Sequence, residues 1–325
     1  MFEDNGAAVW KSVGGTIILC AMSAACAPEP PAPARPLVRF TIGTPGGGIY
    51  TLADALVREY RTSFPNLDVQ VRDRPATVNN ATTVARGDAE CAFSYADAAY
   101  TAYVAGARQA NQAADQIRGV AVLQLAPIHL VVGRHVMVRS VRDLAGLRIG
   151  VGPPMSSTQL EAAFLLDAYG VDRSRMRLES GPFDQAAEQL SQGTLDAFFE
   201  IATYPAESVR RALSDGAVLL PLTGPVIDGL RRESVFLNPT VVPAGVYPRQ
   251  SAPIHTVGVH NLLVCRRDLD EDLVHEFTSR LFELLPSLVT AQESLRLVDP
   301  REAPATPIPL HAGAARYYRE RELER

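Results

Sequence analysis

The sequence predicts a two-lobed α/β protein with mixed, mostly parallel sheets and helices on both faces. Its 325 residues are more than one ordinary core holds and suit two lobes of roughly 100–150 residues each. From Leu37 onward, apolar runs typical of strands alternate with segments of helical spacing, and the alternation occurs in two successive series. Repeated strand–helix–strand units favour parallel strands covered by helices on both sides.

The first series begins with a strand at 37–42 that ends in glycines. A helix follows from about residue 49, because Leu52, Leu56 and Tyr60 recur at helical spacing. Further strands are expected at 67–71, 91–93, 119–125 and 128–132, and further helices at 77–85 and 97–105.

The second series repeats this arrangement. A strand at 147–151 precedes a helix at 159–169, and a long apolar strand lies at 256–265. A strand at 197–200 and helices at 141–145, 183–192, 205–213 and 271–284 complete the expected elements.

The N-terminal segment has the pattern of a secretory signal. A basic flank at Lys11 precedes an uncharged apolar stretch, 13–25, that ends in small residues. The residues before Cys26 resemble a bacterial lipobox, with Ser23 where an aliphatic residue is usual. We expect a signal peptide at 1–25, lipidation of Cys26 and a Pro-rich linker at 26–37, with cleavage without lipidation as the alternative.

Composition narrows the class of protein. The net charge of -5 and the pI of about 5.7 give no basic footprint, so no nucleic acid is expected as a partner. No apolar run past the N-terminus reaches the roughly 20 residues of a membrane span, so a lipid anchor is the only expected membrane contact. Cys91 and Cys265 form a disulfide or are two small buried residues, and the second interpretation is favoured.

The sequence favours a binding protein over an enzyme. It contains no GxSxG, HExxH or CxxC motif, so we expect no catalytic residue, no metal site and no cofactor. His129, His135, His255 and His260 lack a partner at ligand spacing and are interpreted as structural or surface residues. An exported, two-lobed α/β chain of this kind is best explained as a binder of a small solute.

Candidate binding residues lie in the loops that follow the strands, because ligands of open α/β sheets lie beyond the carboxyl ends of the strands. The loop at 43–48 is Gly-rich, which lets backbone N–H groups approach an anion at a helix N-terminus. Its candidates are Gly47, Gly48 and Tyr50. A purely structural turn is the alternative for the glycines, and packing in the core is the alternative for Tyr50.

Two further loops of the first series carry polar side chains. Asn79 and Asn80 either contact the ligand or cap the helix that begins there. In the next loop, Ser94 and Tyr95 are the contact candidates, whereas Asp97 is expected to be an N-cap.

The second series contributes hydroxyls and one acid. Ser156, Ser157 and Thr158 precede a helix; one is expected to cap it, and the others can donate to a carboxylate. Glu200 ends a buried strand, where an unpaired carboxylate is costly. It is therefore expected either to bind a cationic group of the ligand or to pair with an arginine.

Six motifs occur in order along the chain. They are GTPGGGIY at 43–50, GDAECAFSYAD at 87–97, VRDLAGLRIGVG at 141–152, LDAFF at 195–199, VPAGVYP at 242–248 and HAGAARYY at 311–318. The ordered set resembles the TAXI family, the solute receptors of one class of tripartite ATP-independent periplasmic (TRAP) transporters. The chain departs from that family at Ile49, where a tyrosine is common, and at Glu200, where apolar residues are usual.

The resemblance implies a type II periplasmic-binding fold. Lobe 1 is then 38–133 plus 263–325 and lobe 2 is 134–262, with crossing strands near 132–134 and 259–265. It also implies a periplasmic or extracytoplasmic receptor that hands a small carboxylate or amino-acid-like solute, of the glutamate or glutamine class, to TRAP permease subunits. The acid at Glu200 favours a ligand that carries an amine.

Two alternatives stay open. An ABC-transporter receptor has the same fold, although the VPAGVYP turn and the C-terminal HAGAARYY segment favour the TRAP class. A ligand sensor that docks on a membrane signalling protein is the second alternative.

Overall fold

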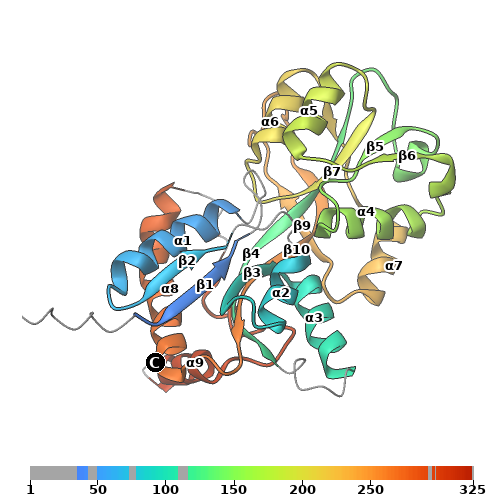
Figure 1. Cartoon of the computed structure of the whole chain (residues 1–325). Helices are drawn as coiled ribbons and strands as arrows, with labels where there is room; N and C mark the ends of the chain where they lie inside the picture. Colours follow the sequence, from blue (N-terminus) through green and yellow to red (C-terminus); the bar gives the residue numbers. More distant parts are fainter. Residues whose placement is uncertain are drawn as a thin grey trace, which may run out of the picture. The chain divides into compact units, whose positions relative to one another are not determined.

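The structure is a computed structural model that describes residues 35–42, 50–72, 78–108, 116–291, 295–296 and 298–323. Figure 1 labels its helices and strands. The expected signal peptide at 1–25, most of the linker at 26–37, Cys26, Gly47 and Gly48 lie outside the described residues.

The strands form a mixed sheet. They are β1 Leu37–Thr41, β2 Asp68–Val71, β3 Cys91–Tyr95, β4 Ile117–Val132, β5 Arg148–Gly150, β6 Arg177–Glu179, β7 Ala197–Ile201, β8 Val218–Leu219, β9 Asn238–Val242 and β10 Ile254–Arg266. Their order is β2-β1-β3-β10-β4-β7-β5-β6, with β8 beside β4 and β9 beside β10. β1 is parallel to β2 and β3, and β5 is parallel to β6 and β7, whereas β4 and β10 make antiparallel pairs.

Helices cover both faces of the strands. They are α1 Tyr50–Ser63, α2 Val78–Ala85, α3 Ala96–Arg108, α4 Ser157–Ala168, α5 Phe183–Ser191, α6 Glu207–Ser214, α7 Pro225–Glu233, α8 Glu271–Ala291 and α9 Ala312–Leu323, with 3₁₀ helices η2 Val141–Leu144 and η3 Arg173–Arg175. The predicted α/β class, with helices on both faces, is confirmed. Among the described helices, none is both long and apolar enough to cross a bilayer.

Two parts of the sheet are built alike. In the middle of β1, Arg39 makes a forked contact with Glu90, and its backbone N–H donates to the same carboxylate (2.7 Å). At the start of β5, Arg148 contacts Asp196 in the same manner, and its backbone N–H also donates to that carboxylate (2.8 Å). The two predicted series are therefore structurally equivalent units, and the ends of β3 and β7 occupy matching places.

The same equivalence explains two glycines. Gly87 follows α2 and Gly193 follows α5, with φ of 77° and 70°. Glycine adopts this left-handed conformation without steric cost. The carbonyl of each glycine then accepts a hydrogen bond from the arginine of its own unit.

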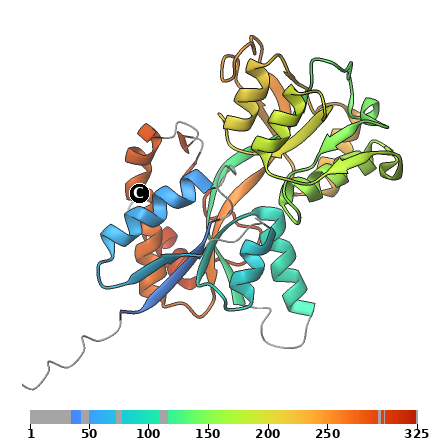
Figure 2. The same ribbon diagram turned by 45° about the horizontal axis from the view of Figure 1, so that its top comes forward.

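Large apolar side chains hold the helices on the strands. On one face of β1 and β3, Tyr60 of α1 stacks on Phe277 of α8 with ring centroids 4.8 Å apart, and Phe40 packs against both. Figures 1 and 2 show α2 and α3 on the opposite side of these strands. Around β7, separate buried clusters form against α4 and against α5 and α6.

β4 is one strand, so the predicted break between strands at 119–125 and 128–132 is wrong. β4 pairs with β10 up to Pro127 and with β7 from Ile128. A proline lacks the N–H that donates to a neighbouring strand. Because Pro127 lies where β4 changes partners, its missing N–H interrupts little of the hydrogen bonding between strands. This exchange precedes the crossing expected near 132–134, and Gly258 of β10, opposite Pro127, lies just before the expected 259–265.

Cys91 and Cys265, the two cysteines that follow the N-terminal segment, are paired. Cys91 of β3 and Cys265 of β10 lie opposite each other in the antiparallel ladder, with Cα atoms 4.0 Å apart, and form a disulfide. Both side chains are fully buried. The favoured interpretation of two unlinked small residues was therefore wrong, although their burial is confirmed.

Candidate functional site

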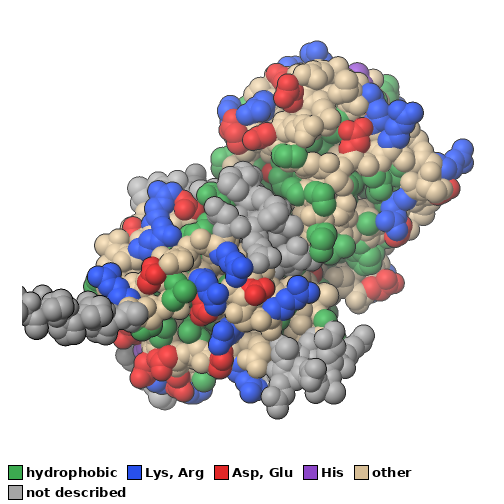
Figure 3. All heavy atoms as spheres, viewed as in Figure 1, with side chains coloured by type: hydrophobic (Ala, Val, Ile, Leu, Met, Phe, Trp, Pro, Cys, Tyr) green, Lys and Arg blue, Asp and Glu red, His purple; other side chains and the backbone are tan. Residues whose placement is uncertain are grey.

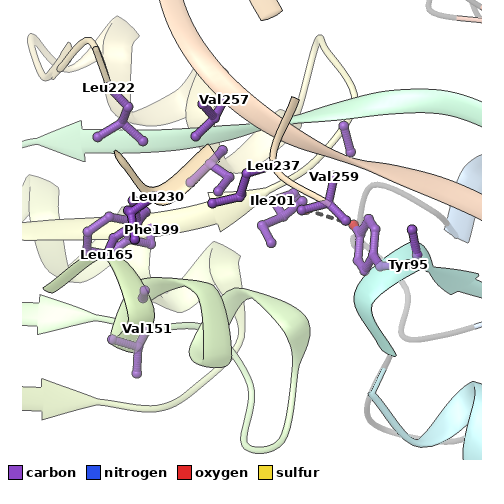
Figure 4. Packing of buried hydrophobic residues seen from close by; sticks show 14 of the residues in the cluster. Tyr95, Val151, Leu165, Phe199, Ile201, Leu222, Leu230, Leu237, Val257 and Val259 are labelled. Carbon is purple, nitrogen blue, oxygen red and sulfur yellow. Dashed lines mark hydrogen bonds between the residues drawn. The ribbon is translucent and has the colours of Figure 1, made fainter. Parts of the chain in front are cut away.

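The strand ends of the two equivalent units are hydrogen-bonded to each other. The hydroxyl of Tyr95, the last residue of β3, donates to the carbonyl of Ile201, the last residue of β7, at 3.0 Å. Figure 4 shows this bond beside Val259 of β10. The backbone N–H of Ile201 donates to the Oγ1 of Thr158 in α4 at 3.1 Å. Two predicted site residues, Tyr95 and Thr158, thus both bind the backbone of one residue, Ile201.

The N-terminus of α4 adjoins this junction. Ser156 is its N-cap and accepts a hydrogen bond from the backbone N–H of Gln159 at 3.2 Å, which confirms that one hydroxyl of this loop caps the helix. Ser157 and Thr158 are buried in the first turn. A helix N-terminus carries partial positive charge, so this turn is suited to an anionic group.

One acid lies in the first turn of α3, and another lies in the second turn of α4. Glu161 is only 7% exposed, and its Oε2 has no hydrogen-bond partner in the described structure. Burial, and then the nearby charge of Asp97, raise the pKa of Glu161 to about 8. Burial raises the pKa of Asp97 to about 6, although backbone N–H groups of its own turn oppose the shift. These two carboxyl groups therefore lie within electrostatic range of each other.

Asp97 does not precede its helix, contrary to expectation. α3 begins at Ala96, so Asp97 is its second residue rather than the N-cap. Its Oδ1 is buried without a partner. The local sequence pattern indicated only a capping role for this acid. Glu161, whose pKa is raised by the charge of Asp97, comes from a different unit of the chain.

Glu200 makes a hydrogen bond within its own unit instead of the expected ion pair with an arginine. It is fully buried, its Oε2 accepts a hydrogen bond from the hydroxyl of Ser208 in α6, and its Oε1 has no partner. Within the described residues no arginine pairs with it, so that expectation was wrong. Burial raises the pKa of Glu200 to about 8, which keeps the carboxyl group largely protonated near neutral pH.

A neutral histidine lies close to Glu200 on β4. His129 Nε2 is 3.0 Å from the hydroxyl of Tyr247, and that hydroxyl accepts from the backbone N–H of Ala206 at 3.0 Å. Burial lowers the pKa of His129 to about 4, so the imidazole stays uncharged. This histidine fastens Tyr247 of the VPAGVYP turn, which agrees with its interpretation as structural.

The asparagines lie inside α2 and do not cap it. The helix starts at Val78, so Asn79 and Asn80 are its second and third residues. The Asn80 amide donates to the carbonyl of Phe93 at 2.8 Å, and its Oδ1 is buried without a partner. The side chain of Asn79 lies outside the described part of the structure.

The remaining predicted residues divide between the core and the junction. Ser94 is buried, and its hydroxyl lies 3.3 Å from the carbonyl of Tyr95. Tyr50 is half-buried at the start of α1 and packs against the core of the first unit.

Two buried amides escaped sequence analysis. Gln124 of β4 and Asn261 of β10 are fully buried, and neither amide oxygen nor amide nitrogen of either residue has a partner. Asn261 lies opposite Tyr95 in the ladder. Single polar residues within long apolar strands were the available signal, because an unpaired amide in such a strand is costly.

The described residues hold no group of three or more His, Cys, Asp or Glu side chains suited to a metal ion. The junction instead offers hydroxyls, amides, carboxyl groups and a helix N-terminus. These are the groups that orient a small polar solute by hydrogen bonds.

Solved structures share this fold. The structure is similar to PhnD1 from Prochlorococcus marinus in complex with methylphosphonate, with a TM-score of 0.53, 13% identity, and coverage of 89% of this chain and 97% of that chain. A protein from Bordetella bronchiseptica is similar with a TM-score of 0.51 and 18% identity, and the match covers 81% of this chain and 76% of that chain. The match to the periplasmic aliphatic sulphonate binding protein SsuA from Escherichia coli has a TM-score of 0.48 and 16% identity, and it covers 87% of this chain and 78% of that chain.

The order of the strands and the helices on both faces define a fold class, the two-lobed α/β fold of the periplasmic-binding type, which PhnD1 shares. The chain belongs to the NMT1-like family, whose model matches residues 40–321.

Proposed function

We propose that this protein is a non-enzymatic, extracytoplasmic receptor that closes over a small carboxylate or amino-acid-like solute. The glutamate or glutamine class is the leading candidate, and the receptor delivers the solute to a TRAP permease. Lobe 1 is 38–133 plus 263–325, lobe 2 is 134–262, and Cys26 carries a lipid anchor. Membership of the NMT1-like family supports the receptor role, and the order of the TAXI-like motifs supports the TRAP assignment.

The main support for the proposed ligand class is the combination of hydroxyl and carboxyl groups in the first two turns of α4. Buried hydroxyls at a helix N-terminus suit a carboxylate, since the helix dipole and O–H donors both favour negative charge. One helical turn further on, the free Oε2 of Glu161 and the carboxyl group of Asp97 suit an ammonium group. A zwitterionic solute satisfies both.

This proposal moves the cationic end of the ligand away from Glu200. That carboxyl group bonds to Ser208 of α6 and lies near the charge of Asp184 of α5. Asp97 lies two residues after the end of β3, and Glu161 lies in the helix that follows β5, on the side of the sheet where ligand-binding groups of this type of sheet occur. Gly47, Gly48, Tyr50, Asn79 and Ser94 stay in the proposal as contacts from the first lobe.

A thermal-shift screen tests the ligand class. Amino acids, polyamines, amine-free organic acids and phosphonates are compared at equal concentration and pH. We expect stabilisation by amino-acid-like compounds, and loss of that stabilisation in Glu161→Gln. Stabilisation only by anions that lack an amine would overturn the zwitterion proposal while leaving a solute receptor.

An ABC-type receptor is the second candidate. Its support is the fold shared with PhnD1, whose structure contains methylphosphonate. The two systems differ in energy source, so uptake driven by an imposed ion gradient in ATP-free vesicles, with the receptor added, supports the TRAP assignment. Uptake that requires ATP and ignores the gradient supports the ABC assignment.

A further inference from the structure

A pocket lies at the opposite end of α4 from the junction. Its volume is about 520 Å³, and its lining includes Arg142, Gly146, Tyr169, Gly170 and Arg175. These residues belong to the segments that enter β5 and β6, whereas the candidate site lies where β5 and β7 end. α4 spans 12 residues, so roughly 18 Å of helix separates the two places.

The pocket is open and carries unpaired positive charge. The guanidinium groups of Arg142 and Arg175 are exposed and form no ion pair within the described part of the chain, whereas neighbouring Arg173 is paired with Asp167 at 2.7 Å. A Cβ atom added at Gly146 or Gly170 meets nothing within 4 Å. Figure 3 shows basic side chains along this margin, beside β5 and β6.

The one acid that lines the pocket is already engaged. Asp172 accepts hydrogen bonds from the backbone N–H and the hydroxyl of Ser174, at 3.0 and 2.6 Å. These bonds, and to a smaller extent the charge of Arg175, lower the pKa of Asp172. Arg142 lies within electrostatic range of the half-buried Tyr169. Two guanidinium forks are therefore free to take carboxylates from another molecule.

We propose that this pocket docks an acidic segment of the membrane protein that receives the solute. The proposal rests on the proposed receptor function. A guanidinium fork matches a carboxylate in two hydrogen bonds, and the pocket's concave shape suits single side chains. A flat anionic lipid surface fits less well, because it cannot enter a concave pocket as a single side chain can. The position at the far end of α4 leaves the solute site unobstructed.

Side-chain NMR of the full, natively processed chain tests the docking chemistry. The Nε–Hε signals of arginine are followed while an end-blocked Gly-Glu-Gly-Glu-Gly peptide is added. We expect the signals of Arg142 and Arg175 to shift, and a peptide with Gln for Glu to leave them unchanged. No shift overturns the proposal, as does binding to vesicles of phosphatidylglycerol and phosphatidylethanolamine without a peptide response.

Uptake in cells tests the role of the pocket. Charge reversal in Arg142→Glu with Arg175→Glu is expected to lower solute uptake at least tenfold, while the purified variant keeps the solute-induced thermal shift of the wild type. The matched control reverses two exposed arginines elsewhere, Arg86 and Arg319, and should leave uptake unchanged. Normal uptake by the pocket variant overturns the docking proposal, provided that gene deletion abolishes uptake. If deletion has no effect, the receptor function itself fails, and the peptide titration still decides the pocket's chemistry.

Discussion

The hydroxyl of Tyr95 is bonded to the carbonyl of Ile201, and each residue is the last of its strand in one of two equivalent units. Hydrogen bonds therefore connect β3 to β7 and β7 to α4, because the Oγ1 of Thr158 accepts from the N–H of the same Ile201. The proposed solute site at the start of α4 therefore lies beside the contact that joins the units.

Tyr95→Phe tests this contact. The ring keeps its packing, but the Ile201 carbonyl loses its donor, so we expect a loss of about 1 kcal/mol in the free energy of unfolding, measured by urea denaturation. We also expect solute affinity to fall several-fold, because the proposed solute site at the start of α4 adjoins this hydrogen bond.

Tyr60→Phe is the matched control. Tyr60 is likewise fully buried and donates to a backbone carbonyl, that of Phe277, at 3.0 Å, but within one unit. It should cost a similar unfolding free energy and leave solute affinity unchanged. Equal losses of affinity in both variants would show that Tyr95 acts only through overall stability.

The acid pair predicts how the binding of a cationic solute depends on pH. The pKa values of about 6 for Asp97 and about 8 for Glu161 mean that both groups lose protons as pH rises from 5 to 8.5. Ammonium binds the ionised forms better, so affinity should rise over this interval. Glu161→Gln should weaken binding about tenfold or more at pH 8 and flatten the dependence, measured by calorimetry.

The control for this experiment is Glu207→Gln. Glu207 is an exposed acid of α6 that pairs with Arg210. Its substitution should leave the pH dependence of solute binding unchanged. An affinity that falls as pH rises would contradict the assignment, because it would indicate that the protonated acids donate to an anion.

Glu200 predicts a stability change with pH. Its pKa of about 8 in the folded protein exceeds the ordinary value of 4.5, so the folded state retains a proton that the unfolded chain releases. Stability from this group is complete below about pH 4.5 and is lost as pH rises toward 8, on the order of 1 kcal/mol per pH unit. Glu200→Gln should flatten this decline in urea denaturation from pH 5 to 8.5. An unchanged slope would mean that Glu200 is ionised when folded.

The disulfide predicts redox-dependent stability. Cys91 and Cys265 are 174 residues apart in sequence, and such a link restricts the unfolded chain. Replacing both with serine should lower the free energy of unfolding by about 2–5 kcal/mol, and a reductant should then have no further effect. If reductant leaves the wild type as stable as before, the bond does not form in the native protein.

Much of the fold followed from local patterns. Apolar segments predicted β1, β2, β3, β5, β7, β10 and most helices, since periodicity and glycine turns are local signals. β6, β8, β9, α7 and α9 were missed. Pro127 was interpreted as a break because partner exchange along a strand is a property of the whole sheet.

The site was less predictable because its partners come from different units. Ser156 was recognised as a potential cap from its own neighbours. The meeting of Tyr95 with Ile201, the pairing of Cys91 with Cys265 and the proximity of Asp97 to Glu161 depend on strand order and register, which local sequence does not encode.

Identification of the bound solute tests the central claim most directly. The protein is purified from its native envelope without added ligand, denatured, and the released small molecule is identified and quantified by mass spectrometry. We predict about one equivalent of a compound that carries both a carboxylate and an amine. Consistent recovery of an amine-free anion, such as a phosphonate or a sulphonate, would contradict the ligand assignment made from Ser156 to Thr158, Asp97 and Glu161.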